Sequence, residues 1–254
     1  MGSTGGSEKE FLEALAANCG GAYLHGARAM GKPWRLEEDL ALGDLGLPMA
    51  LPPNNATVLR APAAKVATDL AERVDAFFSA SPGGGYEVWS IWPTLDLSPV
   101  GFSARAAPCM VREPGGDSPP RPVGLEVAEV QDDAGMRDVW PVLDEAFCDH
   151  RVPEPFWDAR VLAEEYRVWV GRVDGRAVTT ATAFVGHGFV GVYAVATLAE
   201  ARGRGYGEAV TWAATLCRPD LPATLQASEM GRPVYERMGC RTVTTFTVWE
   251  TDRR

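Results

Sequence analysis

The stretch ARGRGYGEAV, residues 201–210, places three glycines and two arginines directly before a helical pattern. Apolar residues recur at helical spacing from Tyr206 onward, which predicts that a helix begins near Gly205. The first N–H groups of a helix lack partners and, with the helix dipole, favour an anion. Glycines let the backbone approach phosphate oxygens, and Arg202 and Arg204 add charge-assisted hydrogen bonds. We therefore expect a phosphate-binding loop, against the alternative of a solvated turn that uses glycine only for its conformation.

Two better-known phosphate motifs are excluded. The P-loop needs a lysine after its last glycine, and the last lysine of this chain is Lys65. Gly203, Gly205 and Gly207 give a G-x-G-x-G spacing rather than G-x-G-x-x-G, and no acidic residue follows on a strand end as dinucleotide binding requires. A nucleoside triphosphatase is therefore the least favoured function.

The elements around this loop alternate between strand and helix. Glycine permits tight reversals at 173–176 and 186–188, which separates three strands within 165–197. This order predicts an α/β (α+β) fold, with a mixed, mostly antiparallel sheet flanked by helices. Further strands are predicted at 125–130, 224–227 and 242–249, and helices at 136–147, at 156–166, after Gly205 and shortly before residue 242.

The linker EPGGDSPPRP divides the chain into residues 1–112, the linker 113–122 itself, and residues 123–254. The first part reads as a mixed α/β segment without a chemical motif. Its predicted elements are a helix over 9–29 interrupted at Gly20 and Gly21, a strand at 56–60, a helix over 62–79 and a strand at 86–92.

Composition limits the function classes. The 254 residues are 46% apolar with a formal net charge of −10, which makes nucleic acid an unlikely partner and favours a cationic substrate. The polar start, the lack of a long apolar run and five scattered cysteines without a CxxC pair predict a cytoplasmic chain with free thiols, no membrane contact and no metal. Arginine outnumbers lysine 21 to 3, which is typical of a GC-rich bacterial genome.

Two segments resemble the GCN5-related N-acetyltransferase (GNAT) family. The run from Arg202 to Gly207 fits its [RQ]-x-x-G-x-[GA] signature, after a strand and before a helix. The run from Tyr235 to Cys240 resembles its Y-x-x-x-G-[F] element. The resemblance covers about residues 123–250. Residues 40–112 resemble the later part of such a fold more faintly, so we expect a tandem protein whose first, degenerate copy binds no cofactor.

The resemblance implies an acetyl-CoA site. Backbone groups of the strand would pair with the pantetheine arm and donate to the acetyl oxygen, and loop amides would hold the pyrophosphate. A plain buried strand is the alternative for the first set. The strand residues are Val195, Ala196 and Thr197, and the loop residues are Arg202, Gly203, Arg204, Gly205, Tyr206, Gly207 and Glu208.

Tyr235 matches the position of the family's usual general acid. A phenol with a pKa near ~10 can protonate a leaving thiolate whose thiol has a pKa near ~8.5, given suitable geometry. The alternative is a tyrosine packed between helix and sheet. Ser228 lies where the family often has a cofactor-binding asparagine, and it equally fits an N-cap for the following helix.

This sequence departs from the family pattern in two places. Cys240 replaces a phenylalanine, which we expect to alter packing only. A glutamate base found in some members is absent, because Ala223 stands at that position. The remaining base candidates are water or the loop residues Asp149, His150 and Glu154; His187 and His25 are expected to be structural or without a role.

Four aromatic residues fall on the helices expected to cover the acceptor cleft: Trp140, Phe156, Trp157 and Tyr166. They fit either a substrate pocket or, more simply, core packing.

The resemblance implies an N-acyltransferase that moves an acetyl group from acetyl-CoA to a primary amine, by direct attack with Tyr235 as general acid. A small-molecule amine is the expected partner, with a homodimer left open. The alternative is a non-catalytic acyl-CoA-binding or regulatory module, which the missing base favours and the retained Tyr235 opposes.

Overall fold

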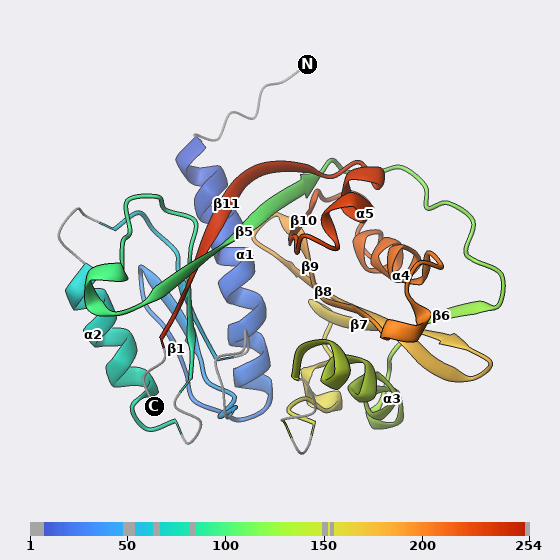
Figure 1. The fold of residues 1–254 in the computed structure, drawn as a ribbon, viewed down its shortest axis with the longest axis horizontal. Helices are drawn as coiled ribbons and strands as arrows, with labels where there is room; N and C mark the ends of the chain where they lie inside the picture. Colours follow the sequence, from blue (N-terminus) through green and yellow to red (C-terminus); the bar gives the residue numbers. More distant parts are fainter. Residues whose placement is uncertain are drawn as a thin grey trace.

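The computed structural model describes residues 8–47, 54–62, 67–81, 85–148, 152 and 155–251. Figure 1 shows one long twisted sheet with helices packed against it. The sheet has eleven strands in the order β1-β2-β3-β4-β11-β5-β10-β9-β8-β7-β6. The mixed, mostly antiparallel sheet flanked by helices that the sequence predicts is confirmed.

The strands are β1 (Trp34–Leu36), β2 (Leu40–Gly43), β3 (Asn55–Val58), β4 (Glu87–Ser90), β5 (Ser103–Arg112), β6 (Leu125–Glu129), β7 (Tyr166–Val173), β8 (Arg176–Gly186), β9 (Phe189–Thr197), β10 (Ala223–Gln226) and β11 (Arg241–Glu250). The helices are α1 (Glu8–Ala29), α2 (Ala67–Phe78), α3 (Asp133–Leu143), α4 (Tyr206–Thr215) and α5 (Arg232–Arg237), and short helical turns are η1 (Ser98–Val100), η2 (Asp144–Cys148), η3 (Ala159–Val161) and η4 (Ala199–Ala201).

The centre of the sheet joins the two halves by exchanging strands. β5 precedes the linker in sequence, yet it lies between β11 and β10. β11 closes the chain, yet it lies between β4 and β5. Each half therefore places its last strand on the other half's side, and the halves share one continuous hydrogen-bonded sheet. The division at 113–122 into two domains remains a prediction from the sequence.

Helix α1 lies against both halves, and its glycines are packing positions rather than breaks. An added Cβ at Gly20 would lie 2.9 Å from the Cβ of Ala41 and 3.0 Å from that of Thr57. At Gly21 it would lie 2.8 Å from the Phe184 ring. The predicted interruption is wrong, because close packing on β2, β3 and β8 requires glycine here while the helix runs unbroken from Glu8 to Ala29.

Asn18 ties the same helix to the second half. Its side-chain amide donates to the Gly186 carbonyl at 2.8 Å, and its Oδ1 accepts from the Tyr193 hydroxyl at 2.6 Å. Asn18 is fully buried, so losing either partner would leave a polar group unpaired in the interior. The N-terminal helix is therefore an integral part of the β8–β9 region.

Two more sequence predictions change. The helix expected over 156–166 is wrong: only the turn η3 forms, and Tyr166 already begins β7. Asp158 accepts from the Arg160 N–H, and Asp133 accepts from the Ala159 N–H, so side chains replace the helical ladder. The helix expected over 136–147 ends earlier, and a π-helical turn, η2, follows a proline inside α3.

The remaining predicted elements are confirmed within two residues at most of their ends. Of the helix predicted over 62–79, α2 forms the part Ala67–Phe78, and residues 63–66 lie outside the described residues. Both predicted reversals form with two successive positive φ angles, at Asp174 and Gly175 and at His187 and Gly188. This backbone matches the twist of adjacent antiparallel strands.

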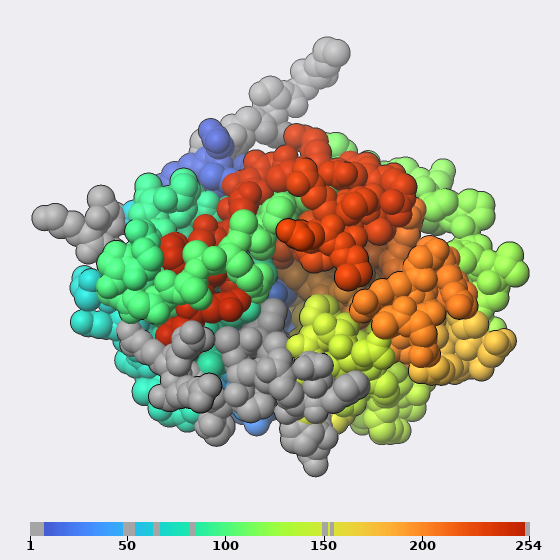
Figure 2. Space-filling view, in the orientation of Figure 1, coloured from blue at the N-terminus to red at the C-terminus, as the bar shows by residue number. Residues whose placement is uncertain are grey.

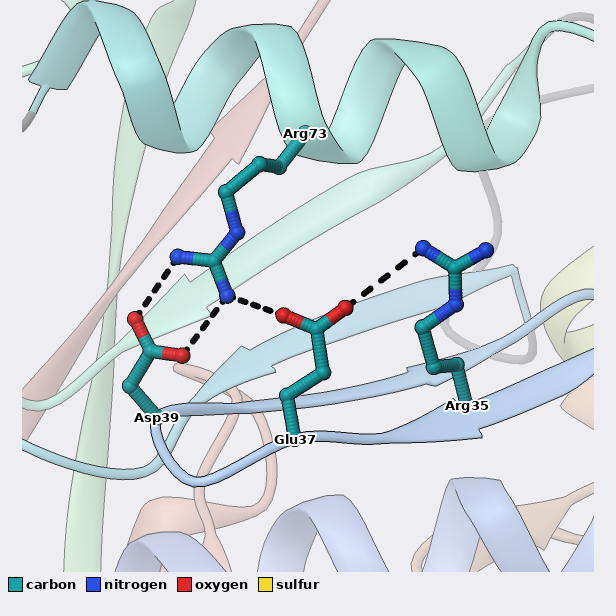
Figure 3. A network of polar contacts seen from close by, with 4 residues as sticks. All are labelled: Arg35, Glu37, Asp39 and Arg73. Carbon is teal, nitrogen blue, oxygen red and sulfur yellow. Dashed lines mark hydrogen bonds and ion pairs between the residues drawn. The ribbon is translucent and has the colours of Figure 1, made fainter.

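A charged network fastens α2 to the β1–β2 turn. Figure 3 shows Arg73 of α2 between Asp39 and Glu37, with Arg35 on the far side of Glu37. Arg73 donates to both oxygens of Asp39, at 2.9 and 2.7 Å, which lowers the pKa of the Asp39 carboxyl. These groups are partly exposed, so the network fixes geometry more than it adds stability.

The packing of α1 predicts the effect of filling Gly20. Gly20→Val should lower the free energy of unfolding by about 1–3 kcal/mol, because rigid strand atoms cannot yield to the new side chain. Ala17→Val is the control, because it adds the same β-branched side chain at a half-buried position of α1. Urea denaturation measures the free energy of unfolding of both variants. An equal decrease in the two variants would contradict the close-packing role of Gly20.

Candidate functional site

A cleft of about 610 Å³ opens beside the exchanged strands. The surface is hollowed between the C-terminal α5 and the segment of α3 (Figure 2). Its walls come from both halves of the chain. α1, β4 and β5 contribute Ala22, Tyr23, Glu87, Trp89, Arg105, Ala106, Ala107 and Pro108, and the second half contributes Leu143, Phe147, Cys148, Phe156, Trp157, Tyr166, Val192, Tyr193, Ala194, Val195, Gln226, Ala227, Ser228, Glu229, Arg232 and Tyr235.

β9 carries a bulge where it borders the cleft. Tyr193 pairs with Thr182 and Ala196 with Thr180, so two residues of β9 lie opposite one of β8. One of the two, Ala194, has a φ of 49°, a left-handed conformation that is rare for alanine. A bulge withdraws backbone groups from the ladder and turns them aside. Ala194 and Val195 thus present main chain beside the cleft.

β9 and β10 separate next to this bulge. They pair in parallel only at Val190 with Ala223 and at Gly191 with Thr224. Beyond that point β10 continues to pair with β5, up to Gln226 opposite Cys109. The two central strands therefore diverge, and the cleft occupies the side where they open.

The glycine-rich loop follows β9 as the sequence predicts. Gly203 and Gly205 have φ angles of 76° and 77°, and Gly205 precedes α4 without a side-chain cap. An added Cβ at Gly207 would lie 2.9 Å from the Thr197 hydroxyl, so glycine lets α4 start directly against β9. The leading N–H groups of α4, including those of Tyr206 and Glu208, therefore have no side-chain cap, and a helix start of this kind favours an anion.

Several side chains hold this loop in place. The Arg202 Nε donates to the Thr197 carbonyl at 3.1 Å, so this arginine orients the loop. The Ala199 N–H donates to Glu145 at 2.7 Å, which links η4 to the π-helical turn. Arg204 is exposed. Of the predicted strand residues, Val195 lines the cleft, whereas Ala196 and Thr197 have returned to the ladder with β8.

Tyr235 lies on α5 in the wall of the cleft. Its side chain is 8% exposed, and burial raises the pKa of its phenol to about 12, so the phenol is protonated at neutral pH. Its hydroxyl has no hydrogen-bond partner among the described residues. An added Cβ at Gly231 would lie 2.8 Å from its ring. Cys240 is buried near it, in agreement with a packing role.

Ser228 caps the turn before α5. Its hydroxyl accepts from the Gly231 N–H at 3.1 Å, and its carbonyl accepts from the Arg232 N–H. This is the capping alternative that the sequence left open, although Ser228 also borders the cleft. The Arg237 Nη2 donates to the Glu208 carboxylate at 3.1 Å and so connects α5 to α4.

The base candidates of the 148–155 loop, Asp149, His150 and Glu154, lie outside the described residues. His187 forms a hairpin turn, and burial lowers its pKa. His25 stacks on Tyr166 with ring centroids 4.7 Å apart, which is a packing role.

The four aromatic residues are divided between the cleft and its support. Phe156, Trp157 and Tyr166 line the cleft, and Trp140 packs on Phe156 with centroids 5.2 Å apart.

Sequence reasoning missed the contribution of the first half. Glu87, Trp89 and Arg105 line the cleft from β4 and β5. A signal was present, because Glu87 is a charged residue within the apolar run YEVWSIW. Ala194 was missed as well, since a bulge at an alanine leaves no pattern in the sequence.

The described residues contain no group of three histidine, cysteine or acidic residues arranged for a metal. No helix in the same part of the chain combines the length and apolar character needed to cross a bilayer.

Comparison with known proteins identifies the fold. No family model and no curated protein matches the sequence. A GCN5-related N-acetyltransferase from Kribbella flavida matches with a TM-score of 0.69 and 20% identity, over 94% of this chain and 96% of that one. The chain has the GNAT fold. A GCN5-related N-acetyltransferase from Sphaerobacter thermophilus gives a TM-score of 0.55 and 18% identity, over 79% and 72% of the two chains. A conserved protein from Staphylococcus epidermidis described as functionally unknown gives 0.59 and 13%, over 87% and 93%.

Proposed function

We propose that this chain is an acyl-CoA-dependent N-acyltransferase that transfers an acetyl group from acetyl-CoA to a primary amine of a small molecule. The observation that carries the proposal is the bulge at Ala194 at the point where β9 and β10 diverge, next to the uncapped start of α4. The cleft thus combines main-chain donors for a thioester oxygen with a protonated phenol, and the anion site follows on the loop that leaves β9. The GNAT fold of the chain supports this reading.

The glycine-rich loop fits a diphosphate. Backbone amides at Gly203–Glu208 and the α4 terminus supply donors and positive potential, and the Pro122 ring of the linker lies 3.4 Å from the position of an added Cβ at Gly205. The corresponding parallel pair in the first half, β3 and β4, stays paired over four residues from Asn55 to Val58. We therefore place the acyl-CoA in the second half.

The transfer is a direct displacement. The neutral amine attacks the thioester carbonyl carbon, a C–N bond forms, and the C–S bond breaks with its electron pair on sulfur. Backbone N–H groups at the bulge stabilise the carbonyl oxygen as it gains charge. Tyr235 donates its phenolic proton to the leaving sulfur, the nitrogen releases a proton to water, and the phenolate regains a proton from solvent.

A calorimetric titration tests the site. Acetyl-CoA should bind wild type and bind Gly205→Asp at least ~100-fold more weakly, because a carboxylate would occupy the diphosphate position; this is a loss of about 2.7 kcal/mol. Gly188→Asp is the matched control, since Gly188 also has a positive φ, of 80°, with nothing near its added Cβ. Equal binding by the two variants would reject the loop as the phosphate site.

Binding without transfer to a broad amine panel would instead support the non-catalytic acyl-CoA-binding module.

The phenol predicts a kinetic effect and a pH profile. Tyr235→Phe should lower kcat by roughly 10²–10⁴-fold and leave the Kd for acetyl-CoA nearly unchanged. Since burial raises the pKa of Tyr235 to about 12, the phenol stays protonated to about pH 10, and wild-type kcat should show no alkaline decline below that pH. Steady-state kinetics from pH 6 to 10 measures both. A kcat within threefold of wild type would exclude Tyr235 as the acid.

A further inference from the structure

A buried carboxylate lies in the wall that the first half adds to the cleft. The Glu87 side chain is 3% exposed. Its Oε2 accepts from the Trp89 indole at 2.7 Å, and its Oε1 accepts from the Arg105 Nη2 at 2.8 Å. A carboxylate has about four acceptor positions, so two of its positions remain for another donor.

Pairing with Arg105 does not account for this burial. Arg105 is 47% exposed, and Glu250 already accepts a hydrogen bond from its Nε at 2.6 Å. Burial raises the pKa of the Glu87 carboxyl, which shows that its desolvation outweighs the attraction of Arg105. With both carboxylates ionised, the three side chains carry one net negative charge, so this part of the wall attracts a cation.

Aromatic rings connect this carboxylate to the bulge of β9. Tyr23 lies with its ring centroid 6.0 Å from Trp89 on one side and 6.0 Å from Tyr193 on the other. Tyr193 directly precedes Ala194. Ring faces attract ammonium groups within about 6 Å of their centroids. An extended molecule that follows these rings would join the bulge to Glu87.

We propose that the acceptor is an extended diamine. One amine reaches the bulge at Ala194 and is acylated, while the second, protonated amine is held by the Glu87 carboxylate against the Tyr23 ring, because the Arg105 guanidinium already lies over the Trp89 ring at 5.7 Å. This assignment deepens the proposed N-acyltransferase function and rests on it. The first half of the chain then selects the acceptor, and the second half binds the acyl donor.

Equilibrium binding to the full chain, without acyl donor, tests the anchor. The probes are 1,6-diaminohexane, n-hexylamine and 6-aminohexanoate, each titrated by calorimetry. Wild type should bind 1,6-diaminohexane at least about tenfold more tightly than n-hexylamine, and 6-aminohexanoate most weakly. A tenfold difference corresponds to about 1.4 kcal/mol. This comparison requires no variant.

Two isosteric variants separate anchoring from structure. Glu87→Gln should remove the preference for the diamine and leave monoamine binding within about twofold of wild type. Glu250→Gln is the matched control, because Glu250 binds the same arginine and does not line the cleft. It should keep the preference.

Three results would overturn the proposal. The first is equal binding of the diamine and the monoamine by wild type. The second is an equal loss of the preference for the diamine in Glu87→Gln and Glu250→Gln. The third is tighter binding of 6-aminohexanoate than of the diamine, which would make Arg105 the anchor. A parallel titration with acetyl-CoA keeps the two proposals distinct. If wild type prefers the diamine but does not bind acetyl-CoA, the acyltransferase proposal alone is rejected. If wild type binds acetyl-CoA but does not prefer the diamine, the anchor proposal alone is rejected.

Discussion

The arrangement of this protein depends on the exchange of β5 and β11 at the centre of the sheet. Each strand pairs with the other and with a strand of the opposite half, so the hydrogen-bonded ladder crosses the seam without an edge. An exposed edge would leave a row of unpaired N–H and carbonyl groups. The exchange also brings β4 and β5 to the cleft, and it explains why a half without a chemical motif supplies a wall of the candidate site.

The cleft itself follows from a second constraint, the limited pairing of β9 with β10. β10 pairs with β5 beyond the two residues it shares with β9, and the bulge at Ala194 turns β9 aside. The left-handed backbone at Ala194 costs roughly 1–2 kcal/mol and persists because the strand is paired on both sides of it. The loop and α4 follow directly after the bulged strand, so the uncapped N-terminus of α4 comes a few residues after the part of β9 that lines the cleft.

Local patterns predicted much of this structure. The fold class, both tight reversals and the helix after Gly205 depend on glycine position and on alternation within short segments. Tyr235 was placed by its spacing from a glycine, and it does line the cleft. The failures depend on contacts between distant segments. Gly20 resembles a helix breaker until β2 and β3 pack on it. The Asp158 and Asp133 carboxylates take up N–H groups at the start of the segment where the sequence predicted a helix that does not form. No local pattern shows that Glu87 and Ala194 border one cleft.

Amide hydrogen exchange with and without coenzyme A tests most directly the claim that the second half alone binds the acyl donor. We expect slower exchange at residues 194–195 and 203–208 when coenzyme A is added, because these N–H groups then donate to the ligand. We expect no change at the β3–β4 ladder, residues 55–58 and 87–90. Protection confined to β3 and β4, or no protection anywhere at saturating coenzyme A, would contradict this claim.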